Sequence, residues 1–273
     1  MKYLFLLYFS VNAVVLVGCG NARGEPAGES SVMGSSPAGA ARQSEEPPID
    51  PAFTLEYLMG KFDPAQHPDF VRVEDRYTDG DTYYLRKDTY QAFKLMWDAA
   101  MADGVRLVII SATRNFERQK QIWEAKWTGA RAIENGANAA ERYPDPVERA
   151  LKILEYSSMP GTSRHHWGTD IDLNDLDNYT FEQGPGRPVY EWLSKNASHF
   201  GFCQPYSPKG ADRPHGYKEE KWHWSYVPVA SQLTRLAEEK LRDDMIGGFL
   251  GAETAVKIGV VEKYVLGINP ACE

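Results

Sequence analysis

The chain has 273 residues, of which 42% are hydrophobic and 25% are charged, and its formal net charge at pH 7 is -8. This length and composition are typical of a globular protein with a substantial core. An acidic chain does not offer the basic face that a nucleic-acid backbone requires, so we expect no nucleic-acid partner.

The first eighteen residues have the pattern of a secretory signal, because Lys2 precedes an apolar run that is too short to span a membrane stably. The run ends in Leu16-Val17-Gly18-Cys19, which resembles a bacterial lipobox. This resemblance implies a lipoprotein signal peptide over 1–18, lipidation of Cys19, and an exported protein anchored in a membrane and facing the periplasm or the cell exterior. An ordinary signal peptide that contains a cysteine by chance is the alternative.

Residues 19–49 are rich in Gly, Ser, Ala, Pro and Glu and contain almost no large apolar side chains. Such a segment buries too little apolar surface to offset the entropy that it loses on ordering. We therefore expect a disordered tether here, which joins the lipid anchor to a folded domain over 50–273.

The folded part is expected to be a single α+β domain, with a small antiparallel sheet flanked by helices. The hydrophobic patterns predict, in chain order, a helix over 89–101, a strand over 105–110, a helix over 116–127, a helical stretch over 129–160 that Pro144 and Pro146 break, a helix over 189–200, a strand over 221–227 and a helix over 231–244.

Two cysteines remain beyond the lipobox, Cys203 and Cys272. Two cysteines in an oxidising compartment can pair, and we expect a disulfide that ties the C-terminal tail to the core. Two free buried thiols are the alternative. Neither cysteine has a Cys or His partner at zinc-finger spacing, so we expect no structural zinc knuckle.

The segment SRHHWGTDID, residues 163–172, contains a candidate metal site. In a strand, Asp170 and Asp172 point to the same face, and two carboxylates on one face are costly to bury unless a cation neutralises them. His165 lies on the loop that leads into this strand and can fold back over the same face. Histidine and carboxylate suit zinc, but a third ligand must come from elsewhere.

The candidate for the third ligand lies in EKWHWSY, residues 220–226. Strand alternation puts His223 on the face opposite Trp222 and Trp224. A lone histidine is more often a hydrogen-bonded core residue than a ligand, but Glu220 lies three positions earlier. Hydrolysis at a catalytic zinc needs such a carboxylate to accept a proton from the attacking water.

Together these segments resemble the zinc D-alanyl-D-alanine carboxypeptidase and dipeptidase family, which includes the vancomycin-resistance enzymes. Three motifs in the family's order carry the resemblance, and they span most of the expected domain: Ser111-Ala112-Thr113-Arg114-Asn115 with Gln119, Ser163-x-His165-x-x-Gly168-x-x-x-Asp172, and Glu220-x-Trp222-His223. The resemblance implies that the sheet carries one Zn2+ and that its ligands are His165, Asp172 and His223. It also implies that Glu220 is the general base.

The resemblance extends to the substrate. Arg114 would stabilise the oxyanion or bind a substrate carboxylate, and Ser163 and Gln119 would contact the substrate. Asp170 stands where the family usually has Ala. We predict that Asp170 contacts the substrate. A hydrogen bond to a side chain that binds the metal, and a direct bond to the metal, remain alternatives.

The implied function is a zinc carboxypeptidase that removes the terminal D-Ala from peptidoglycan stem peptides. An L,D-carboxypeptidase or an endopeptidase acting on the same substrate would share this mechanism. A zinc-stabilised module that binds cell-wall peptide is the non-enzyme alternative, although such a module would not need Glu220. The chain contains none of the motifs S-x-x-K, G-x-S-x-G and H-E-x-x-H, which argues against a serine peptidase and against a zincin.

Overall fold

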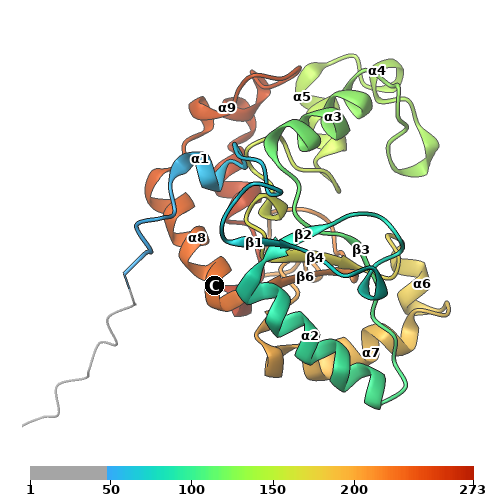
Figure 1. The fold of residues 1–273 in the computed structure, drawn as a ribbon. Coiled ribbons are helices and arrows are strands. Elements are labelled where there is room, and N and C mark those ends of the chain that lie inside the picture. Colours follow the sequence, from blue (N-terminus) through green and yellow to red (C-terminus); the bar gives the residue numbers. More distant parts are fainter. Residues whose placement is uncertain (1–47) are drawn as a thin grey trace, which may run out of the picture. The chain divides into compact units, whose positions relative to one another are not determined.

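The computed structural model describes residues 48–273, which fold into helices arranged around a four-stranded antiparallel sheet (Figure 1). This architecture confirms the α+β class expected from the sequence. The predicted signal peptide, the lipidation site at Cys19 and nearly all of the predicted tether lie outside the described residues.

The strands are β1 (Phe70–Arg72), β2 (Tyr84–Arg86), β3 (Ile109–Ser111), β4 (Asp170–Leu173), β5 (Phe202–Cys203) and β6 (His223–Tyr226). The α-helices are α1 (Leu55–Leu58), α2 (Lys87–Ala102), α3 (Phe116–Trp127), α4 (Ala139–Arg142), α5 (Pro146–Ile153), α6 (Asn178–Glu182), α7 (Arg187–Asn196), α8 (Val227–Lys240) and α9 (Thr254–Ile258). A π-helix covers Val261–Val265, and 3-10 turns include Arg164–His166 and Ala197–Phe200. Within residues 48–273, none of these helices has the length and apolar character needed to cross a membrane.

The main sheet has the strand order β3-β4-β6-β5, and every neighbouring pair is antiparallel. Side chains alternate between the two faces of each strand. One face buries Ile171, Leu173 and Trp224 in a core to which α2 and α7 also contribute (Figure 1). The opposite face of β4 and β6 carries polar residues, which are Asp170, Asp172, His223 and Ser225.

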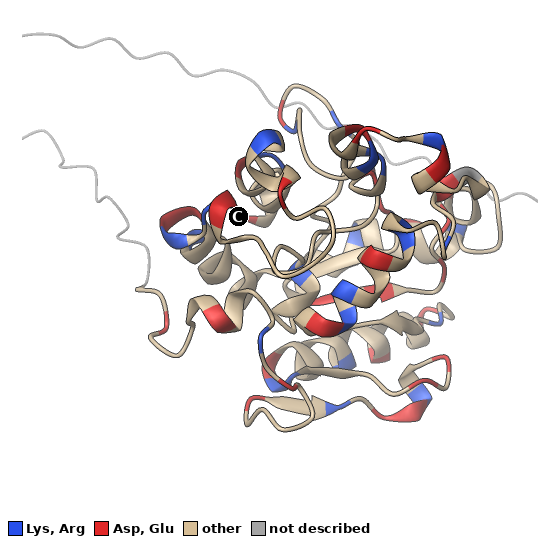
Figure 2. Cartoon of the chain, turned by 90° about the horizontal axis from the view of Figure 1, so that it is seen from above, with Lys and Arg blue, Asp and Glu red and all other residues tan. Residues whose placement is uncertain are grey.

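A second core packs α1, α3, α5, α8 and α9 against one another. The polar face of the sheet is tied to this part of the molecule, because Arg164 donates both to Asp170 on β4 and to Thr234 on α8. Away from the sheet, basic and acidic residues are interleaved along the helices (Figure 2).

Several predicted elements differ from the observed ones in their bounds. The helix over 116–127 agrees with α3 at both ends, whereas the strand predicted over 105–110 forms ladder pairs only from Ile109. The backbone before that point bonds elsewhere: Trp97 Nε1 donates to the carbonyl of Leu107, and Val108 N donates to Asn174 Oδ1. The first part of the predicted strand, residues 105–108, therefore lies outside the ladder of the sheet.

The other differences arise from caps and prolines. The helical stretch predicted over 129–160 is two short helices, α4 and α5, because Asn138 and Asp145 each cap a new start with their side chains. Helix α8 begins at Val227 with Pro228 in its first turn and ends at Lys240, where we predicted 231–244. The helix predicted over 189–200 is α7 followed by the 3-10 turn Ala197–Phe200. The two-stranded sheet of β1 and β2 was not predicted.

Candidate active site

The register of β4 and β6 brings together the three residues that the sequence indicated as metal ligands. Asp172 pairs with His223 across the two strands, and His165 lies in the 3-10 turn that precedes β4. His165 Nε2 lies 3.3 Å from Asp172 Oδ2, and His223 Nδ1 lies 3.3 Å from Asp172 Oδ1. The candidate ligand atoms of the three side chains all lie within 4.8 Å of one another, and all three residues are buried.

Both imidazole rings are held by hydrogen bonds on the side that faces away from this cluster. His165 Nδ1 lies 2.8 Å from the carbonyl oxygen of Ala112, and His223 Nε2 lies 2.8 Å from Asp170 Oδ1. A ring nitrogen bonded to a carbonyl or carboxylate oxygen carries the hydrogen, so in the neutral ring the other nitrogen presents a lone pair. In the neutral form, His165 Nε2 and His223 Nδ1 both face Asp172 and can bind a metal.

Asp172 completes a donor set that is compatible with zinc. Its Oδ1 is buried and accepts no hydrogen bond from any residue in 48–273, a costly state for a carboxylate oxygen. Burial raises the pKa of Asp172, but its interactions with His165 and His223 outweigh this and hold the pKa well below the usual range. Two imidazole nitrogens and one carboxylate oxygen within 4.8 Å of one another are a donor set and a spacing that suit one zinc ion.

Glu220 reaches the same cluster from the loop before β6. Its Oε2 lies 3.2 Å from His223 Nδ1. Its backbone is fixed at both polar groups, since its N–H donates to the carbonyl of Tyr206 at 2.9 Å and its carbonyl accepts from Gln204 Nε2 at 3.1 Å. Burial raises the pKa of the Glu220 carboxyl, and the neighbouring His223 only partly offsets this. A carboxylate so placed suits a proton acceptor.

Arg114 stands on the other side of Asp172, and its orientation is set by two neighbours. Its Nη1 lies 3.7 Å from Asp172 Oδ2 and donates to Ser111 Oγ at 2.7 Å, while its Nε donates to Gln119 Oε1 at 3.0 Å. Gln119 is 1% exposed and also donates to the carbonyl of Ser158 at 2.8 Å. Both ends of this amide are used within the protein. Gln119 therefore orients Arg114, which leaves less of its amide available for the substrate contact predicted from the sequence.

The neighbours of His165 in the motif have separate structural tasks. Ser163 caps the 3-10 turn, because its Oγ accepts from the backbone N–H of His165 at 3.3 Å. His166 is bonded to the backbone at both ring nitrogens: the N–H of Gly161 donates to its Nε2 at 3.0 Å, and its Nδ1 lies 2.6 Å from the carbonyl oxygen of Arg114. His166 therefore links the ligand turn to the segment that carries Arg114.

Asp170 is fully buried, and its carboxylate has no acceptor position to spare. Its Oδ1 accepts from Arg164 Nε at 3.2 Å and from His223 Nε2 at 2.8 Å. Its Oδ2 accepts from Ser225 Oγ at 3.0 Å and from the hydroxyl of Thr169. A carboxylate offers about four lone-pair positions, and four donors occupy them. A substrate or a metal would have to displace one of these donors, so the contacts favour the alternative in which Asp170 bonds to the far side of the His223 ring.

Two buried tyrosines at the site were missed from the sequence. The ring centroid of Tyr206 lies 4.7 Å from that of His223 and 4.8 Å from that of Tyr217. Both tyrosines come from the loop between β5 and β6, which is rich in proline and has no hydrophobic period. No sequence signal of the kind used above could place them.

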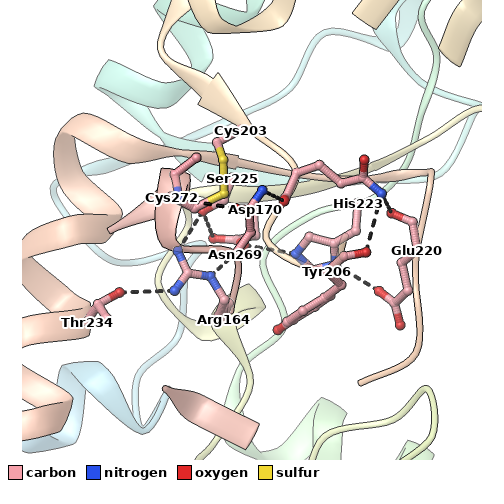
Figure 3. Close-up of a disulfide and its surroundings, with 12 residues drawn as sticks. Arg164, Asp170, Cys203, Tyr206, Glu220, His223, Ser225, Thr234, Asn269 and Cys272 are labelled. Atoms are coloured by element: carbon pink, nitrogen blue, oxygen red, sulfur yellow. Dashed lines mark hydrogen bonds and ion pairs between the residues drawn. A yellow bond between two sulfur atoms is a disulfide. The ribbon is translucent and has the colours of Figure 1, made fainter. Parts of the chain in front are cut away.

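The C-terminal tail supports the segment that holds Glu220. Cys203 and Cys272 are joined in a disulfide, as the sequence led us to expect (Figure 3). Beside it, Asn269 Nδ2 donates to the carbonyl of Gln204 at 3.2 Å, and Asn269 N donates to the carbonyl of Pro205 at 2.8 Å. The tail is thus fixed to residues 204–206, where Gln204 Nε2 and the carbonyl of Tyr206 bond to the backbone of Glu220.

Comparison with known proteins gives several relatives of similar sequence. A D-alanyl-D-alanine carboxypeptidase of Enterococcus faecalis is 30% identical over 166 residues, which cover 61% of this chain and 55% of that protein. YodJ of Bacillus subtilis is 30% identical over 146 residues, which cover 53% of this chain and 46% of that protein. The chain therefore spans about half the length of the curated relatives it matches.

A solved structure of VanYB in complex with D-alanine-D-alanine is 26% identical, with a TM-score of 0.46, and the match covers 64% of this chain and 87% of that one. The family model described as VanY, D-alanyl-D-alanine carboxypeptidase, matches residues 82–229. That range is more than half of the chain and contains Arg114, the three clustered residues and Glu220. The chain belongs to the VanY family of D-alanyl-D-alanine carboxypeptidases.

Proposed function

We propose that this protein is a zinc-dependent carboxypeptidase that removes the terminal D-Ala from peptidoglycan stem peptides. The observation that carries the proposal is the buried cluster of His165, Asp172 and His223, with Glu220 Oε2 3.2 Å from His223 Nδ1. The membership of the chain in the VanY family supports the substrate class.

The ligands would be His165 through Nε2, Asp172 through its carboxylate and His223 through Nδ1. When bound, zinc supplies a Lewis acid that polarises a carbonyl group and brings the pKa of water toward ~7. Glu220 accepts the proton of the attacking water and returns it to the nitrogen of the leaving D-Ala, a transfer for which its raised pKa is suited.

Arg114 stabilises the negative charge that develops on the scissile carbonyl oxygen. Its guanidinium is already oriented by Ser111 and Gln119, so little reorganisation is needed when this charge forms. Ser163 lies beside the first ligand, where its hydroxyl can contact the substrate. Asp170 and Gln119 take no direct part and hold the groups that do.

The test is release of D-Ala from peptides that differ only at their C-terminus. A stem pentapeptide ending in D-Ala-D-Ala is expected to lose its terminal D-Ala, and a tetrapeptide with an L,D-bond before its terminal D-Ala is expected to stay intact. Cleavage should stop after treatment with a strong chelator and return when zinc is added. Release only from the tetrapeptide would assign the L,D-activity, and cleavage only within cross-linked dimers would assign an endopeptidase.

Two outcomes would contradict the proposal more deeply. Zinc-loaded protein that binds these peptides but cleaves none of them would indicate a binding module. Activity that strong chelators leave unchanged, in protein shown to contain no metal, would remove zinc from the mechanism.

A further inference from the structure

A buried ion pair, Arg164 with Asp170, lies next to His223 of the candidate metal site (Figure 3). Arg164 is 1% exposed and Asp170 is 0% exposed, and Arg164 Nε lies 3.2 Å from Asp170 Oδ1. Removing two charges from water carries a desolvation cost that their attraction often fails to return, so such a pair is weak as a device for stability alone. Its position suggests a different role.

We propose that Asp170, fixed by Arg164, is a positioning residue that holds His223 with its Nδ1 free for the metal. The inference rests on the zinc site of the proposed function and adds a residue to it. Asp170 does not touch the substrate or the metal position, since its four acceptor positions are filled by protein donors.

Asp170 is held in place by Arg164, which is itself bonded to three elements of the fold. Arg164 uses its three donor groups on three elements: Nε on Asp170 of β4, Nη2 on Ser225 Oγ of β6 at 2.8 Å, and Nη1 on Thr234 Oγ1 of α8 at 3.0 Å. Its guanidinium also lies over the ring of Trp167, 4.5 Å from the centroid. The carboxylate is therefore held by a rigid frame, which is what a residue that aligns another side chain needs.

Carboxylates face both ring nitrogens of His223. On one side, Nε2 faces Asp170 Oδ1 at 2.8 Å. On the other side, Nδ1 faces two further carboxylates, Asp172 Oδ1 at 3.3 Å and Glu220 Oε2 at 3.2 Å. The bond to Asp170 is the shortest of the three, so it fixes the ring with Nε2 turned toward Asp170 and Nδ1 turned toward the cluster.

The other histidine of the cluster, His165, has different neighbours. His165 is fixed by the neutral carbonyl of Ala112 at 2.8 Å, and among the carboxylates of residues 48–273 its Nε2 faces only Asp172. His223 has more competition at its ligand atom and has a charged acceptor behind it. A carboxylate behind a ligating imidazole also makes that imidazole a stronger donor to the metal.

The test compares zinc binding in the purified protein and in two variants. The double variant Arg164→Met, Asp170→Ala removes the whole ion pair and leaves no unpaired charge. The control Thr234→Ala removes one partner of Arg164 from the same buried network without touching Asp170 or His223. The dissociation constant of zinc is measured by competition with a chromogenic chelator, and the melting temperature of each metal-free protein reports any loss of stability.

We expect zinc binding to weaken about 10–100-fold in the double variant and to stay within about threefold in Thr234→Ala, even where both lower the melting temperature. A folded double variant that binds zinc like the wild type would overturn the proposal. Wild-type protein that binds no zinc would instead contradict the proposed function.

A second measurement does not depend on the folding of any variant. Nitrogen NMR of histidine-labelled, zinc-loaded wild type identifies which ring nitrogen of His223 carries the hydrogen and which binds the metal. We expect hydrogen on Nε2 and zinc on Nδ1. Zinc on Nε2 would contradict the proposal, whatever the affinity for zinc.

Discussion

Arg114 illustrates how single residues at this site depend on the groups behind them. Its planar fork donates to Ser111 Oγ and Gln119 Oε1 while one nitrogen stays 3.7 Å from Asp172. Lysine has the charge but lacks the fork. We predict that Arg114→Lys lowers kcat about 10²–10³-fold, the loss typical of an oxyanion donor, and leaves zinc content unchanged.

The measurement for Arg114 is D-Ala release together with metal analysis on the same preparation. Arg118→Lys is the matched control, because Arg118 is an exposed arginine four residues later, in the first turn of α3. Equal kcat values for Arg114→Lys and the control would show that Arg114 does not stabilise charge in the reaction.

The sequence could identify the residues that face the cluster but not those that hold them. The alternation of β4 put Asp170 and Asp172 on one face, and the resemblance of the motifs to the family selected Asp172 together with His165 and His223, which the structure brings together. The roles of Asp170 and Gln119 depend on partners supplied by tertiary packing, such as Thr234 through Arg164 and the carbonyl of Ser158. No periodic pattern within one segment contains that information.

At the scale of elements, local signals set the helices better than the strands. Helix α3 was placed correctly because Asn115 caps its start and its apolar residues keep helical spacing. The strands have two to four residues each, so tertiary hydrogen bonds decide where they begin. This explains why the run over 105–110 was placed too early and why β1 and β2 were not predicted.

The turn into β4 offers a test of how tightly this part of the fold is packed. Gly168 has φ 77°, and a β-carbon there would collide with the ring of Phe70. Gly104 has nearly the same φ, 76°, with open space around it. We predict that Gly104→Ala lowers the free energy of unfolding by about 1–2 kcal/mol. Gly168→Ala should cost about 1–3 kcal/mol more, because overpacking is added.

Urea unfolding of the two glycine variants measures this difference directly. If both substitutions cost the same, the left-handed backbone would account for the whole effect and the contact with Phe70 would be unimportant.

The tail is held to the sheet by a covalent bond, which gives a second prediction for an element. The disulfide joins cysteines 69 residues apart. In the chain-entropy model a loop of this length contributes about 4 kcal/mol to stability. We predict a loss of that order in the Cys203→Ser, Cys272→Ser double variant, measured by chemical unfolding against oxidised wild type.

Thiol titration gives the independent check on the disulfide. Denatured, unreduced protein should show no reactive thiol from Cys203 or Cys272 before reduction. Two reactive thiols from these positions would contradict the bond.

At the scale of the whole molecule, we propose an exported lipoprotein whose catalytic domain is attached to a membrane through Cys19. The support is the sequence pattern Leu16-Val17-Gly18-Cys19 after an apolar run. We predict that cells expressing the full chain incorporate labelled fatty acid into it and that Cys19→Ser abolishes the labelling. An equally labelled variant would place the lipid elsewhere, and an unlabelled wild type would leave an ordinary signal peptide as the explanation.

The central claim is that one buried cluster works as a zinc peptidase centre with Glu220 as its base, and the variant Glu220→Gln tests it most directly. The amide has nearly the same size and leaves His165, Asp172 and His223 in place, but it cannot accept the proton of the attacking water. Metal content and D-Ala release from a D-Ala-D-Ala pentapeptide are measured on the same preparation. We predict one zinc per chain, as in the wild type, and a fall in kcat of at least ~10²–10⁴-fold. A variant that retains zinc and works within a few-fold of wild type would contradict the claim.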